Sequence, residues 1–79
     1  MKITQSVVSE WRNVANDWLA AHGFHADHIT TGRDAWAVAH QSGITKQAYD
    51  MSRDINDAHI QTALERIFPN AVFRDKKRY

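Results

Sequence analysis

The chain has 79 residues, 43% of them hydrophobic, and a formal net charge of +1. This length supports a single domain, and the hydrophobic content is too high for a disordered segment. Because the chain has no cysteine, neither a disulfide nor a thiolate zinc site stabilises it. No apolar run approaches the roughly 20 residues of a membrane-spanning helix, so we expect a cytoplasmic protein.

An apolar stripe predicts a first helix over residues 5–22. Its apolar residues recur at three- and four-residue steps: Val7, Val8, Trp11, Val14, Ala15, Trp18 and Leu19. Gly23 follows, and glycine suits the left-handed conformation that ends many helices. Trp11 and Trp18 are either core residues or a ridge that binds a partner protein or a second copy of the chain. The second copy would make the protein a homodimer.

A second helix is predicted over residues 32–41. Thr31 and Asp34 have the spacing of a capping box, in which each side chain bonds the other residue's backbone amide. The alanine-rich segment 35–40 favours a helix. The alternative is a hairpin over residues 26–40, since Trp36, Val38 and His40 also alternate as in a strand.

Two further helices are predicted over residues 45–53 and 55–68. Gly43 ends the previous segment, and Thr45 is the expected N-cap of the third helix. Residues 54–57 form a second pattern like a capping box, and Pro69 follows the last apolar face. We expect residues 71–73 to form an extended arm, with a strand over 71–75 as the alternative.

The expected fold is therefore mainly α, a small bundle of about four short helices with a short extended C-terminal arm. The alternative fold is α+β, with the small hairpin or the C-terminal strand. Residues 1–73 carry six Lys or Arg and eight Asp or Glu, whereas residues 74–79 carry four and one. We expect one helical domain over residues 1–73 and a basic tail over 74–79, which either contacts phosphate or only keeps the protein soluble.

Residues 35–54 resemble a helix-turn-helix, the DNA-binding pair of helices locked together by a glycine-containing turn. Four residues match the apolar, small and turn positions of this family: Val38, Ala39, Gly43 and Ile44. Ser42 and Ser52 depart from the pattern, because the family buries aliphatic side chains at these positions. Tyr49 is bulky for its position.

The resemblance implies that Lys46 and Gln47 face the edges of DNA bases. It also implies that four cations contact phosphate: Arg53, Lys76, Lys77 and Arg78. Against this function, Asp50, Asp54 and Asp57 line one face if the helices run on continuously, and they would repel phosphate. The same acidic row is suited to a basic patch on a protein partner.

His22, His25 and His28 are spaced by threes around Asp27. Imidazole and carboxylate groups are ligands of zinc and nickel, so these histidines are the candidates for a metal site. The alternatives are surface histidines in a polar loop, or a sensor of pH. Gly23 interrupts the helix that would align the three side chains, and we expect neither a metal nor a cofactor.

No phosphate-binding glycine loop, nucleophile elbow or cysteine nucleophile is present in the sequence. We therefore expect a protein that is not an enzyme. The function that we predict is a small binding or regulatory module acting through protein–protein interaction, with a helix-turn-helix-like DNA-binding regulator as the alternative. The candidate partner-binding residues are Trp11, Trp18, Asp50, Asp54 and Asp57.

Overall fold

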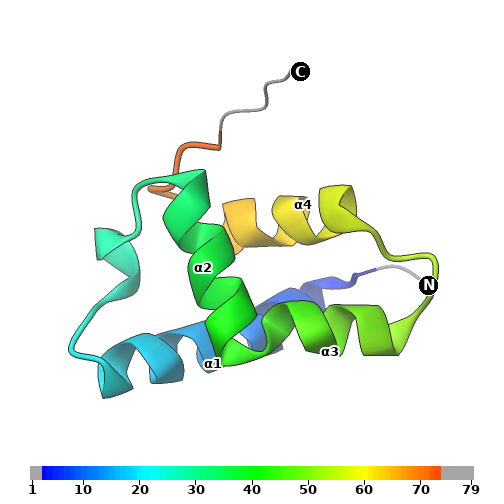
Figure 1. Cartoon of the computed structure of the whole chain (residues 1–79), viewed down its shortest axis with the longest axis horizontal. Helices are drawn as coiled ribbons and strands as arrows, with labels where there is room; N and C mark the ends of the chain where they lie inside the picture. Colours follow the sequence, from blue (N-terminus) through cyan, green and yellow to red (C-terminus); the bar gives the residue numbers. More distant parts are fainter. Residues whose placement is uncertain (1–2, 74–79) are drawn as a thin grey trace.

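The computed structural model describes residues 3–73, which form a bundle of four α-helices (Figure 1). In chain order these are α1 (Gln5–Ala21), α2 (Gly32–Ser42), α3 (Ile44–Met51) and α4 (Asp57–Ile67), with a short 3-10 turn, η1 (Ala26–His28), after α1. Helix α1 contacts all three other helices, and α2 contacts both α3 and α4. The mainly α fold class and the four predicted helices are confirmed.

The hairpin over residues 26–40 is not formed. Thr31 instead caps α2, because its Oγ1 accepts a hydrogen bond of 3.1 Å from the backbone N–H of Asp34. Trp36, Val38 and His40 therefore do not lie on one face of a strand; all three belong to helix α2. Val38 is buried, Trp36 is half-buried and His40 is exposed, as three positions around a helix allow.

The extended arm lies against the beginning of α2 (Figure 1). The N–H of Gly32 donates to the carbonyl of Val72 at 2.8 Å, and the N–H of Val72 donates to the carbonyl of Thr30 at 3.0 Å. These bonds make one parallel bridge between Thr31 and Val72, so residues 71–73 form no strand. Gly32 permits this approach, because a Cβ there would lie only 2.7 Å from the ring of Phe73. The predicted basic tail over 74–79 lies outside the described residues.

A single residue, Gly43, joins α2 to α3. It is the C-cap of α2 and the N-cap of α3, with a left-handed φ of 92°. The prediction that Thr45 caps α3 is therefore wrong. Thr45 lies within the first turn of α3, where its side chain is buried and its hydroxyl is hydrogen-bonded to Nδ1 of His40 at 3.0 Å.

Helix α4 begins with a reciprocal capping box, but two residues later than the sequence suggested. Asn56 is the N-cap, and its Oδ1 accepts from the N–H of His59 at 3.2 Å. The Nδ1 atom of His59 accepts in return from the N–H of Asn56. Histidine therefore takes the place that glutamate or glutamine usually has in this motif.

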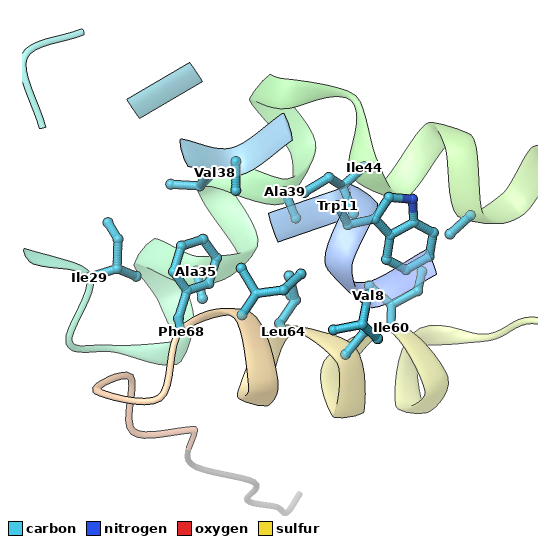
Figure 2. Packing of buried hydrophobic residues seen from close by; sticks show 14 of the residues in the cluster. Val8, Trp11, Ile29, Ala35, Val38, Ala39, Ile44, Ile60, Leu64 and Phe68 are labelled. Atoms are coloured by element: carbon cyan, nitrogen blue, oxygen red, sulfur yellow. The ribbon is translucent and has the colours of Figure 1, made fainter. Parts of the chain in front are cut away.

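The hydrophobic core lies where the four helices meet (Figure 2). Its largest fully buried side chains are Trp11, Leu19, Ile44, Ile60, Leu64 and Phe68. Small residues, among them Ala15, Ala39 and Ala48, are also fully buried and let the helix backbones approach one another. Within residues 3–73, no helix is both long and apolar enough to cross a bilayer.

Candidate functional site

The two tryptophans of α1 have different environments. Trp11 is fully buried in the core, so it has no surface to offer a partner and the predicted two-tryptophan ridge is not formed. Trp18 is half-buried, and the ring of His22 stacks on it at a centroid distance of 4.0 Å. Of the pair, Trp18 alone remains a candidate for partner binding.

An open apolar groove of about 280 Å³ lies beside Trp18, between the end of α1, the η1 turn and α2. We call it the Phe24 groove, because Phe24 in its lining is 57% exposed. The other lining side chains are Trp18, Leu19, His28, Ile29, Asp34, Ala37, Val38 and Gln41. Within residues 3–73, Asp34 is the only carboxylate in this lining, which contains neither lysine nor arginine.

Local backbone geometry places Phe24 at the surface. Gly23 follows α1 with a left-handed φ of 79°, and the N–H of Phe24 donates to the carbonyl of Leu19 at 2.8 Å. The chain thus turns sharply away from the axis of α1, which takes Phe24 off the apolar stripe. The sequence pattern did not identify Phe24 as a candidate because this residue lies outside the apolar stripe. The feature that could have identified it is an aromatic residue directly after the glycine that ends a helix.

The predicted acidic row is not continuous. Helix α3 ends at Met51 and α4 begins at Asp57, so the carboxylates of Asp50 and Asp57 belong to different helices and Asp54 lies in the turn between them. Asp50 also pairs with Nζ of Lys46 at 3.0 Å, and Asp57 accepts a hydrogen bond from the hydroxyl of Tyr49. At least two of the three carboxylates therefore have partners within the chain.

Tyr49 is expected to ionise at an unusually high pH. Its hydrogen bond to Asp57, then burial, and then the negative charge of Asp57 all raise the pKa of Tyr49 above its usual value. Since this pKa is higher in the folded state than in the unfolded chain, the contact stabilises the fold below pH about 10 and is lost as the pH rises through the folded pKa.

Absorbance of the tyrosinate ion measures this titration directly. The chain has two tyrosines, so the experiment uses a Tyr79→Phe background in which Tyr49 is the only one. We expect Asp57→Asn to lower the midpoint of the Tyr49 titration. Equal midpoints with and without the Asp57→Asn substitution would show that the carboxylate does not hold the phenol proton.

The helix-turn-helix resemblance is matched at its buried positions. Val38, Ala39 and Ile44 are all in the core. The turn, however, is the single residue Gly43, whereas the motif usually has three or four turn residues. Ser42 and Ser52, at positions where the family buries aliphatic side chains, are half-buried, and the bulky Tyr49 is 46% exposed.

The residues expected to contact DNA are exposed but lie among carboxylates. Lys46 is paired with Asp50, and the side-chain amide of Gln47 donates to Glu10 of α1 at 3.2 Å. Arg53 is exposed in the turn after α3. The other expected phosphate contacts lie outside the described residues: Lys76, Lys77 and Arg78.

The three histidines proposed as metal ligands make local hydrogen bonds instead. His22 donates from Nδ1 to the carbonyl of Trp18 at 2.8 Å. His25 and His28 form the capping box of η1, with the N–H of His25 donating to Nδ1 of His28 at 3.1 Å. Over residues 3–73, no three His, Cys, Asp or Glu side chains are grouped so that they could hold a metal ion.

The surface of residues 3–73 thus offers an apolar groove with an exposed aromatic side chain, and a face of α3 on which Lys46 pairs with Asp50. Comparison of the chain with protein-family models, with curated proteins and with solved structures finds no match.

Proposed function

We propose that this protein is a non-enzymatic binding module that docks another protein at the Phe24 groove. The observation that carries the proposal is the exposed ring of Phe24 beside the half-buried Trp18 on a concave apolar surface. Burying an exposed phenylalanine side chain contributes about 1.5–3 kcal/mol. Aromatic residues in such positions also dominate the binding energy of protein interfaces.

The lining of the groove indicates the chemistry of the partner. Its apolar surface is suited to an inserted leucine, methionine or aromatic side chain. Among the described lining residues Asp34 is the only acidic one, and none is lysine or arginine, so a lysine or arginine next to the inserted side chain of the partner would complement it. The partner is therefore a protein segment that carries an apolar anchor and a neighbouring basic residue.

Affinity capture with matched surface variants tests this proposal. We expect a protein that binds the wild type to be lost from Phe24→Ser and kept by Tyr49→Ser, which removes a comparably exposed aromatic ring on α3. Circular dichroism establishes that both variants are folded. A partner that Phe24→Ser retains, but Asp50→Asn with Asp54→Asn loses, would assign the interaction to the acidic residues and refute the groove.

DNA binding is the second candidate, supported by the burial of Val38, Ala39 and Ile44 around the α2–α3 junction. Phosphate binding weakens steeply as salt rises, whereas an apolar interface responds little. Titration with random duplex DNA at low and moderate salt, followed by tryptophan fluorescence, separates the two functions. Salt-sensitive binding that is lost in the Lys46→Glu, Gln47→Ala double variant would favour DNA.

Sedimentation at several concentrations tests whether the protein associates with a second copy of itself.

A further inference from the structure

A second open cavity, of about 570 Å³, lies where the C-terminal arm meets α2. Its volume is within the range of sites that bind small molecules. The lining combines the polar side chains of Thr30 and Arg33 with the apolar side chains of Trp36, Val72 and Phe73. We call it the Arg33 cavity. None of its described lining residues also lines the Phe24 groove, so the proposal for this cavity does not depend on the proposed function.

Among the described residues that line this cavity, Arg33 is the only one with a charged side chain. Its guanidinium makes no hydrogen bond or ion pair with any residue in the described range 3–73, unlike Arg12, which donates to the carbonyl of Arg66. A guanidinium presents two parallel N–H groups whose spacing matches the two oxygens of a carboxylate. The guanidinium of Arg33, unpaired within residues 3–73, is therefore available to bind an anion.

Beside Arg33, the lining combines polar residues, Thr30, Thr31 and Gln61, with an aromatic and aliphatic part. Trp36 and Phe73 are half-buried, and each packs against the core while also lining the cavity. Val72 is 62% exposed and contributes a further apolar surface. The exposed face of an indole favours a flat ring at van der Waals distance, because stacked aromatic rings attract each other beyond the area that they bury.

From these features we infer that the Arg33 cavity binds a small aromatic monocarboxylate. The carboxylate pairs with the guanidinium of Arg33, and the ring of the ligand lies against Trp36. We infer a monocarboxylate rather than a polyanion because Arg33 is the only cation among the described lining residues.

Naphthoate, with its uncharged analogue naphthamide, is the probe for this site. We expect naphthoate to shift the amide resonances of residues 30–36 and 72–73 of the intact protein. Because a hydrogen bond to a charged group is lost in each case, we expect binding to be about tenfold weaker for naphthamide or for the Arg33→Gln variant. Arg53→Gln is the matched control, since Arg53 is an exposed arginine outside the cavity.

A third variant, Trp36→Ala, separates the stacking surface from the charge, and we expect it to weaken naphthoate and naphthamide alike. The amide spectrum of each variant reports whether it is folded. Equal affinity for naphthoate and naphthamide, unchanged affinity in Arg33→Gln, shifts centred on the Phe24 groove, or no shift at millimolar naphthoate would each overturn the assignment.

Discussion

Replacing Trp11 with alanine is expected to unfold most of the protein. Trp11 is the largest fully buried side chain of the core, and truncating a buried tryptophan to alanine costs about 3–5 kcal/mol. A single core in a chain of this size rarely contributes more than about 3–5 kcal/mol of net stability. The loss is therefore as large as the free energy of unfolding itself.

Trp18→Ala is the matched control, because it removes the same atoms from a half-buried position. Far-UV circular dichroism during urea unfolding measures both variants, and we expect the Trp18 variant to stay folded in water. We expect Trp11→Phe to lower the free energy of unfolding by an intermediate amount. It keeps an aromatic ring and removes the buried Nε1–H, which has no hydrogen-bond partner in the described part of the chain. An equal fall in the free energy of unfolding for Trp11→Ala and Trp18→Ala would contradict the assignment of Trp11, but not Trp18, to the buried core.

Gly43→Ala is expected to lower the free energy of unfolding by roughly 1–2 kcal/mol, which is the cost of the left-handed conformation for a residue with a Cβ. Apart from Gly43, its chain neighbours and the adjoining helix backbone, no heavy atom of the described residues lies within 4 Å of the position that a Cβ would take at Gly43, so the cost arises from the backbone conformation. For a chain of this size we expect the melting temperature to fall by roughly 4–16 °C.

Synthetic protein with D-alanine at position 43 provides a stringent control for this prediction. D-alanine has the same atoms as L-alanine but favours positive φ, so we expect it to leave stability unchanged or to raise it slightly through the entropy of the unfolded chain. Thermal unfolding of the two proteins gives the comparison. An equal fall in melting temperature for both stereoisomers would mean that the added methyl group, and not φ, disturbs the junction.

The sequence predicted the helices well because each carries an apolar stripe with a three- to four-residue period, and Gly23 and Gly43 each follow the end of one. It could not distinguish the two tryptophans of α1. Trp11 and Trp18 lie on the same stripe, and only the packing of the other three helices around α1 decides that Trp11 is covered completely.

The caps show a similar limit. Thr45 and Gly43 are both acceptable beginnings for a helix, and the choice depends on a tertiary contact, the burial of Thr45 with its hydroxyl bonded to His40. The Phe24 groove and the Arg33 cavity were not predictable from the pattern. Their walls come from segments distant in sequence, such as Trp18 with Gln41 and Arg33 with Val72.

The one-residue connection between α2 and α3 also makes the chain sensitive to length. An α-helix turns about 100° per residue, so one inserted residue at Gly43 would rotate Ile44 and Ala48, both now buried, away from the core. Residues 52–56 join α3 to α4 outside any helix and have more room to absorb such a change. We expect insertions and deletions to be tolerated there and rejected at position 43.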